Sequence, residues 1–306
     1  MMRVLLFAML ALMASPAFAQ RLDATPRTVV ITAFPPEWDA LIPAVRHTKS
    51  YRINGMTYLT GTMAGKPVVL MQSAVSMVNA AMNTQLVLDR FNVRRIVFSG
   101  IAGGVDPALA IGDVIVPEQW GQYLEVSFAR GPPGSWVTPE PVDGIAPASF
   151  GMMFPRGVRV GNAAEPARRH YTFAADPALI ALARKVAAHV MLRRCIDHNA
   201  VSPEAGCLAH SPKIVIGGTG VSAGVFADNA DFRAYLFTAW QARVLDMESG
   251  AVAQVAYANR VPVIVFRSLS DLAGGDAGAN QMNTFMTLAS ANSAMVVKTF
   301  VAALPN

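Results

Sequence analysis

An uninterrupted apolar run that ends in charged residues occupies positions 261–278, VPVIVFRSLSDLAGGDAG. Positions 263–266 carry apolar side chains on both alternating faces, which is typical of a strand covered on both sides in a largely parallel sheet. Arg267, Ser270 and Asp271 follow at its carboxyl end. Because ligands of open α/β sheets bind beyond the carboxyl ends of the strands, this placement indicates a functional site. The alternative is an ordinary strand-to-loop transition with one satisfied ion pair.

Strands and helices are predicted to alternate along the chain. The periodicity predicts strands at 28–32, 95–99, 113–117, 214–218 and 262–269, and a hairpin over 58–72. It predicts helices at 75–91, 177–192, 228–236, 247–259 and 280–304. Residues 35–37 are expected to form a turn, and residues 100–112 a glycine-rich loop. This order predicts an α/β protein with a three-layer α/β/α architecture.

The first 20 residues, MMRVLLFAMLALMASPAFAQ, have the pattern of a secretory signal. Arg3 precedes an apolar stretch at 4–13, and Ala17-Phe18-Ala19 forms a small-residue cleavage site. We therefore expect residues 1–19 to be removed after Ala19 and the mature protein to be periplasmic or secreted. No later stretch has 18 or more uninterrupted apolar residues, so no stable membrane association is expected.

Residues 20–306 are expected to form a single domain with insertions near 119–174 and 193–212. The region 131–166 is rich in proline and glycine and is interpreted as a long surface insertion. The net charge of +5 is modest and the basic residues are scattered. A nucleic-acid-binding surface is therefore not indicated.

The two cysteines, Cys195 and Cys207, allow two main interpretations. With His198 and His210 they form a C-x2-H…C-x2-H spacing that could hold zinc. An exported chain matures where thiols oxidise, so a disulfide is favoured over zinc and over free thiols. No other metal site is expected.

Three carboxylates stand at predicted element boundaries. Glu37 follows the first strand, Glu248 lies in a first helical turn behind the candidate N-cap Asp246, and Asp271 ends the last strand. Glu248 could merely compensate the helix dipole, and Asp271 could merely pair with Arg267. Three carboxylates at such positions in one α/β layer are better explained together by a common site.

Three stretches carry a family resemblance: VVITAFPPEWDAL at 29–41, SGIAGGVDPALAIGDVIVP at 99–117 and ARVLDMESGAVAQVAYANRVPVIVFRSLSDLAGG at 242–275. They resemble the nucleoside phosphorylase and nucleosidase family. Within it they are most similar to the methylthioadenosine/S-adenosylhomocysteine nucleosidases and the plant bark-storage-like proteins. The resemblance implies a mixed, partly closed central sheet with helices on both sides and a homodimer or larger assembly. No cofactor is expected.

The resemblance also implies chemical roles for the carboxylates. Cleavage of an N-glycosidic bond passes through an oxocarbenium-like sugar, so it needs an acid for the base and a stabiliser for the cation. Asp271 would protonate the purine N7, with Ser270 and Arg267 orienting it. Glu248 would bind the ribose hydroxyls, and Glu37 would polarise the attacking water.

The remaining implied contacts line a nucleoside pocket. Met247 would lie against the sugar, and Ile101, Ala102 and Gly103 would bring backbone close to the nucleoside. The stretch 217–222, with Ser222, would flank the base. Phe226 is either the aromatic residue that stacks on the purine or a core residue.

Hydrolysis is favoured over phosphorolysis, because Glu37 and Phe98 occupy places where phosphorylases of this family carry arginines. A carboxylate there would repel phosphate. Arg46, Arg52, Arg90 or an arginine of a second subunit could still supply the positive charge that a bound phosphate needs. A nucleoside-binding or storage protein without activity is the further alternative, because fold does not secure activity.

Overall fold

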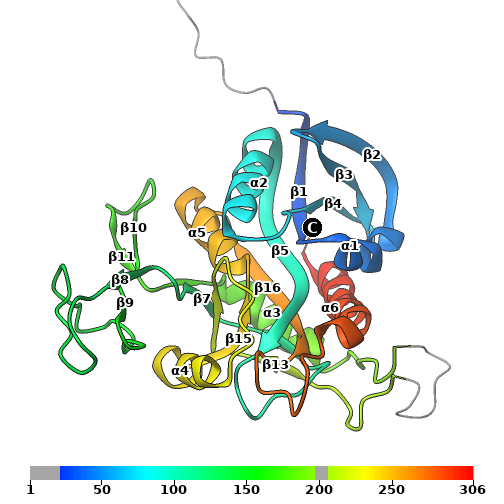
Figure 1. The fold of residues 1–306 in the computed structure, drawn as a ribbon. Coiled ribbons are helices and arrows are strands. Elements are labelled where there is room, and N and C mark those ends of the chain that lie inside the picture. The colour runs from blue at the N-terminus through cyan, green and yellow to red at the C-terminus, as the bar shows by residue number, and fades with distance from the viewer. Residues whose placement is uncertain (1–20, 197–205, 306) are drawn as a thin grey trace, which may run out of the picture.

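A mixed sheet of twelve strands forms the centre of the protein in the computed structural model, which describes residues 21–196 and 206–305 (Figure 1). Its strands are β1 (Asp23–Thr32), β2 (Val45–Ile53), β3 (Met56–Met63), β4 (Lys66–Gln72), β5 (Phe91–Gly104), β6 (Val114–Val116), β7 (Gln119–Gln122), β12 (Thr172–Ala174), β13 (Ile214–Ile216), β14 (Thr219–Ser222), β15 (Ala242–Asp246) and β16 (Val263–Asp271). The main order is β12-β7-β14-β15-β5-β1-β4-β3-β2, and β16, β6 and β13 branch from β5. Because β1, β4, β5 and β16 are parallel, their carboxyl ends meet at one edge.

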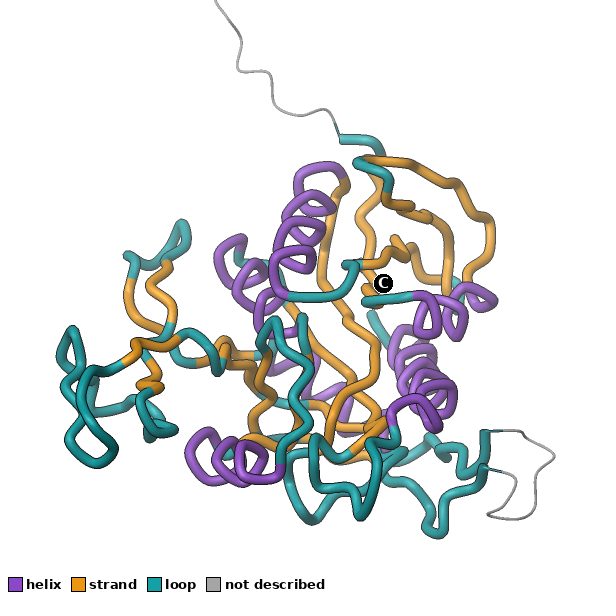
Figure 2. The backbone as a smooth tube through the Cα atoms, viewed as in Figure 1, coloured by secondary structure: helices purple, strands orange, loops and turns teal. Residues whose placement is uncertain are grey.

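Helices cover both faces of this sheet (Figures 1 and 2). They are α1 (Pro35–Leu41), α2 (Met77–Arg90), α3 (Pro177–Ala187), α4 (Ala230–Trp240), α5 (Ser249–Asn259) and α6 (Met282–Ala303), with a 3-10 turn η1 (Ile42–Ala44). In β1, Val29 and Ile31 pack into the cluster that contains residues of α2 and α5, whereas Val30 packs with α1, α3 and α6. The predicted three-layer α/β/α architecture with a mixed sheet is therefore confirmed.

The strand β16 is buried along its whole length, as its apolar run predicts. Two other local predictions are wrong. Residues 35–37 begin the helix α1 instead of forming a turn, because proline suits the first positions of a helix, where no N–H partner is needed. Residues 100–104 continue β5 instead of opening a loop, because glycine there permits close packing that a side chain would prevent. Five strands of the main sheet were not predicted at all: β2, β7, β12, β14 and β15.

The proline- and glycine-rich region forms two small sheets outside the main one. β8 (Val126–Phe128) pairs with β9 (Met153–Pro155), and β10 (Val158–Val160) pairs with β11 (Arg168–His170). In Figure 1 these two small sheets project from the body of the molecule beyond β7. Phe150 anchors them by packing its ring against Phe232 and Tyr235 of α4.

Cys195 and Cys207 form a disulfide, which confirms the favoured interpretation. His198 of the alternative zinc spacing lies outside the described residues. Both sulfurs are already bonded to each other, so they are not the thiolates that zinc binds. Asn292 of α6 holds the start of this region, because its side chain contacts both the N–H and the carbonyl of Arg193.

Within the described residues, α6 is the one helix long and apolar enough to cross a membrane by length and composition. More than half of its most apolar window is buried inside the protein, where it packs against β16 and β5. Its apolar composition is therefore explained by its place in the core.

Candidate active site

A cavity of about 260 Å³ lies at the carboxyl ends of β1, β5, β15 and β16. Of the ten predicted catalytic and substrate-binding residues, eight line it: Glu37, Ile101, Ala102, Gly103, Met247, Glu248, Ser270 and Asp271. The parallel strands β1, β5 and β16 bring their carboxyl ends to one edge of the sheet. The strand β15 pairs antiparallel with the end of β5 and brings Asp246 and the residues after it to the same place. Arg267 and Ser222 are not among the lining residues.

Glu37 is buried beneath this cavity in the first turn of α1. Its Oε2 accepts a hydrogen bond from the Ala33 N–H at 2.5 Å, and its Oε1 accepts one from the Ile101 N–H at 2.8 Å. Burial raises the pKa of Glu37, and the positive charge of Arg267 opposes this rise. The carboxyl group is thus fixed in place yet less acidic than an exposed glutamate.

Glu248 approaches from the other side, at the N-cap of α5. Its Oε1 accepts a hydrogen bond from the Ser76 N–H at 2.8 Å. Burial, and then the negative charge of Asp246, raise the pKa of Glu248 to about 7, against the attraction of Arg267. Asp246, predicted as the N-cap residue, accepts hydrogen bonds from the N–H groups of Glu248 and Ser249.

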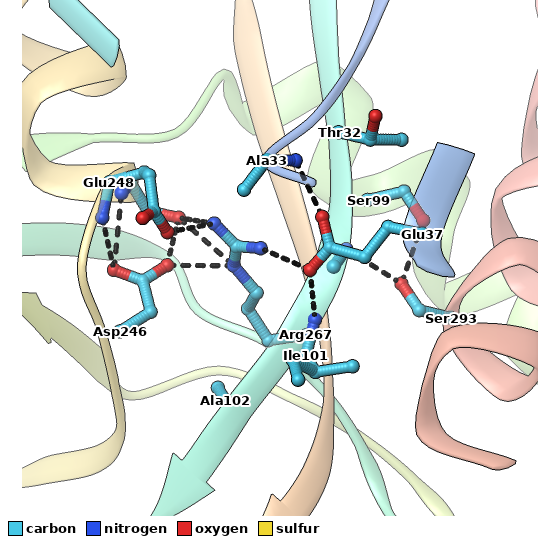
Figure 3. Close-up of polar contacts among 12 residues, drawn as sticks. Thr32, Ala33, Glu37, Ser99, Ile101, Ala102, Asp246, Glu248, Arg267 and Ser293 are labelled. Atoms are coloured by element: carbon cyan, nitrogen blue, oxygen red, sulfur yellow. Dashed lines mark hydrogen bonds and ion pairs between the residues drawn. The ribbon is translucent and has the colours of Figure 1, made fainter. Parts of the chain in front are cut away.

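Arg267 lies fully buried between these carboxylates (Figure 3). Its Nε is 2.7 Å from Asp246 Oδ2, its Nη2 is 3.6 Å from Glu248 Oε2, and its Nη1 is 3.7 Å from Glu37 Oε1. The guanidinium also lies 4.0 Å from the centre of the Phe98 ring. Among the described residues, Nη1 has no hydrogen-bond partner.

Among the described residues, Arg267 makes no ion pair or hydrogen bond with Asp271, which it was expected to orient. The guanidinium forms ion pairs with Asp246, Glu37 and Glu248 instead. One buried cation opposite three buried carboxylates leaves part of the negative charge uncompensated. Burial is the largest cause of the raised pKa values of Glu37 and Glu248, and the neighbouring carboxylates add to it against the attraction of Arg267.

Asp246 is the site residue that the sequence analysis missed, since it was interpreted only as a helix cap. It lines the cavity, pairs most closely with Arg267, and accepts hydrogen bonds from the hydroxyls of Ser222 and Ser249. Ser222, expected beside the substrate, does not line the cavity, and its hydroxyl donates to Asp246. The signal available in the sequence was a second acid two residues before Glu248.

Asp271 occupies the last position of β16 and is 3% exposed. Ser270 Oγ donates to its Oδ2 at 2.9 Å, and the Ala273 N–H donates to its Oδ1 at 2.9 Å. Burial raises the pKa of Asp271, although these hydrogen bonds act in the opposite direction. The contact from Ser270 has the orienting geometry that the resemblance implies.

Gly100 allows Glu37 and Arg267 to meet. A Cβ atom at this position would lie 1.7 Å from Arg267 Nη1 and 2.5 Å from Glu37 Oε1. Behind it, the Gly100 N–H donates to Ser293 Oγ at 3.1 Å, and Ser293 Oγ is 2.9 Å from Ser99 Oγ (Figure 3). Glycine is therefore required in this part of β5 for the close approach of a charged pair.

The rest of the cavity wall is largely apolar and includes Phe34, Val75, Phe226 and Met282. Phe226 is 52% exposed, so it lies at the rim and not in the core. Among residues 21–196 and 206–305, no three histidine, cysteine, aspartate or glutamate side chains gather as a metal site would require. The chemistry available here is that of carboxyl groups and one guanidinium.

Comparison with known proteins places this geometry in a family. A model described as the phosphorylase superfamily matches residues 27–302. A 5′-methylthioadenosine/S-adenosylhomocysteine nucleosidase of Mycobacterium bovis is 28% identical over 271 residues, covering 88% of this chain and 94% of the relative. The enzyme of the same name from Marinomonas sp. is 29% identical over 246 residues, covering 80% of this chain and 85% of the relative.

Two solved structures share the fold. A nucleosidase of the same name from Streptococcus pneumoniae has a TM-score of 0.66 at 24% identity, covering 91% of this chain and 100% of the other. The futalosine hydrolase of Helicobacter pylori has a TM-score of 0.65 at 21% identity, covering 91% of this chain and 98% of the other. Since the family model extends from the first strand to the last helix, the chain belongs to the phosphorylase superfamily.

Proposed function

We propose that this protein is a purine nucleosidase that hydrolyses the N-glycosidic bond of adenosine-type nucleosides. The observation that carries the proposal is the convergence of Glu37, Glu248 and Asp271 on one cavity. The curated relatives named above are nucleosidases for methylthioadenosine and S-adenosylhomocysteine. The apolar rim suits a substrate with an apolar 5′ substituent.

Asp271 would act as the general acid. Because burial raises the pKa of this carboxyl group, it retains a proton at a higher pH than an exposed aspartate does. The proton would pass to the base nitrogen as the glycosidic electron pair moves into the base. Glu248 would accept hydrogen bonds from the ribose hydroxyls, and its charge would stabilise the cationic sugar.

Glu37 would position and deprotonate the attacking water. Its carboxylate lies 3.7 Å from Arg267 Nη1, which has no hydrogen-bond partner within residues 21–196 and 206–305, and accepts from the Ile101 N–H. Oxygen addition to the anomeric carbon would release one proton to Glu37. The water thus supplies the hydroxyl of the free sugar, while Asp271 supplies the proton on the free base.

The charge around the site favours water over phosphate as the nucleophile. The buried cation Arg267 is already opposed by Asp246, Glu37 and Glu248. A phosphate dianion beside the sugar would meet net negative charge, which costs free energy in a buried site. Arg46, Arg52 and Arg90 do not line the cavity, so they do not offset this charge within the chain.

A panel of purine nucleosides tests the proposed function. We expect the purified protein to release the base from adenosine, methylthioadenosine, S-adenosylhomocysteine or futalosine in phosphate-free buffer, followed by absorbance and chromatography. A strict requirement for phosphate would make the protein a phosphorylase. Tight nucleoside binding by calorimetry without release of base from any substrate would support the binding or storage alternative.

We also propose that the protein is exported. The signal-like start of the sequence and the disulfide Cys195–Cys207 support this, since disulfides persist in oxidising compartments. Fractionation of bacterial cells that express the protein should recover a periplasmic form, and its mass should match a chain that starts at Gln20. Recovery of only the full-length chain from the cytoplasm would contradict export.

A homodimer is the proposed assembly. Large apolar side chains are exposed on α2, as Val78 at 79%, and in the projecting hairpins, as Ile145 at 77% and Val137 at 63%. Exposed apolar patches are typical of surfaces that bind another protein chain. Sedimentation at micromolar concentration should give twice the chain mass, whereas a monomer would contradict the proposal.

A further inference from the structure

We propose that Asn280 is a positioning residue for Asp271, which it joins to the loop on the base side of the cavity. The inference rests on the proposed function in one respect, namely that Asp271 acts as the acid. Asn280 lies in the connection between β16 and α6, and its side chain does not line the cavity.

The carboxamide of Asn280 contacts three segments. Its Nδ2 is 3.0 Å from Asp228 Oδ1 and 3.4 Å from Asp271 Oδ1, so it is shared between two carboxylates. Its Oδ1 accepts a hydrogen bond from the Met282 N–H at 2.9 Å, at the start of α6. Both hydrogen-bonding ends of the amide are thus occupied, which fixes its orientation.

These contacts connect segments that line different parts of the cavity. Asp228 directly follows Phe226 and Ala227, which line the cavity, and Met282 lines it from α6. The two loops also pack tightly elsewhere, because a Cβ atom on Gly274 would lie 2.4 Å from the backbone nitrogen of Asn229. Asn280 is therefore placed to keep Phe226 and Asp271 at a constant separation.

The contacts also make the two oxygens of Asp271 unequal. Oδ1 faces two N–H donors, from Ala273 and Asn280, and these groups can only donate. Oδ2 faces the hydroxyl of Ser270, which can turn to donate to the Ala102 carbonyl at 3.4 Å instead. A proton on the carboxyl group is consequently accommodated on Oδ2, which fixes the direction from which it is delivered.

Several other charges act on the same carboxyl group. Asp276 in the same loop raises the pKa of Asp271, and Asp228 lies beyond Asn280. Arg233 of α4 packs near Gly275 and donates to the Gly104 carbonyl. Across the cavity lie Glu37 and the Glu248 carboxyl group. Since the amide of Asn280 stabilises the ionised form, its removal should raise the pKa of Asp271 further.

The test uses Asn280→Ala and Asn280→Asp, with Asn92→Ala as the matched control. Like Asn280, Asn92 is a partly buried asparagine with a hydrogen-bonded amide, which in this case donates to the Ala24 carbonyl. It lies at the amino end of β5, whereas the cavity lies at the carboxyl end. Asn280→Asp retains an oxygen that can accept from the Met282 N–H, so the start of α6 should be preserved in this variant. It therefore serves as the second variant if Asn280→Ala folds poorly. The measurements are the pH dependence of kcat/KM and the carboxyl titration of Asp271 by NMR without substrate.

We expect the alkaline limb of kcat/KM and the NMR midpoint to move upward by about half to one pH unit in Asn280→Ala. The shift should be larger in Asn280→Asp, where a carboxylate replaces the donor, and absent in Asn92→Ala. Unchanged NMR midpoints in both Asn280 variants would overturn the inference. If the wild-type protein releases no base, the proposed function fails, and the NMR titration still decides the role of Asn280.

Discussion

Asp271→Asn is expected to lower kcat/KM for base release by about two to four orders of magnitude, the range in which general acids contribute. The amide is nearly isosteric and can still meet Ser270 and Ala273, so the fold of the strand end should persist. It has no proton to transfer to the leaving base. Steady-state kinetics across pH 5 to 9 would also show the loss of the alkaline limb.

The matched control is Asp89→Asn on the surface of α2, where the carboxylate accepts a hydrogen bond from Gln85 and lies outside the cavity. Its turnover should equal that of the wild type. Substrates with more acidic leaving bases should lose less in Asp271→Asn, because they need less protonation. Unchanged turnover of every nucleoside in Asp271→Asn would remove Asp271 from the mechanism.

Arg267→Met is expected to destabilise the protein by about 3–5 kcal/mol, the cost of removing one partner from a buried ion pair. Methionine retains much of the packing against Phe98 but leaves Glu37, Asp246 and Glu248 without their buried cation. Urea unfolding at several pH values measures the effect. Arg94→Met is the control, since Arg94 is exposed and should change the free energy of unfolding by less than about 0.5 kcal/mol.

The deficit in the free energy of unfolding of Arg267→Met, relative to the wild type, should grow as pH rises. Burial already raises the pKa values of Glu37 and Glu248, and loss of the cation raises them further. The folded variant then binds more protons than the unfolded chain, so its stability falls as pH rises from the ordinary glutamate pKa towards the raised one. The deficit is thus smallest near pH 4 and largest above pH 7. A deficit independent of pH would show that lost packing, and not charge, dominates.

The fold was predictable where local pattern and burial agree. The apolar run of β16 predicted a strand covered on both sides, and all of its residues are buried. The prediction was wrong at Pro35–Glu37 and at Gly100, because the same residues serve turns in one context and a helix start or a close contact in another. Only the packed structure distinguishes these cases.

The site was predictable in its carboxylates but not in the contacts between them. Glu37, Glu248 and Asp271 stand at element ends, which a sequence reveals. The pairing of Arg267 with Asp246 and Glu37 joins residues from three separate elements, and no local pattern encodes it. The same holds for Asn280, whose two acceptors lie 52 and 9 positions away. Side-chain direction at the end of a strand is decided by its neighbours in space.

The origin of the oxygen on the released sugar tests the hydrolytic mechanism most directly. The protein would be incubated with methylthioadenosine in ¹⁸O-enriched water containing phosphate, and the sugar product analysed by mass spectrometry immediately after quenching. Water activated at Glu37 predicts free sugar with one ¹⁸O at the anomeric position and no sugar phosphate. A sugar 1-phosphate without the label would contradict the mechanism.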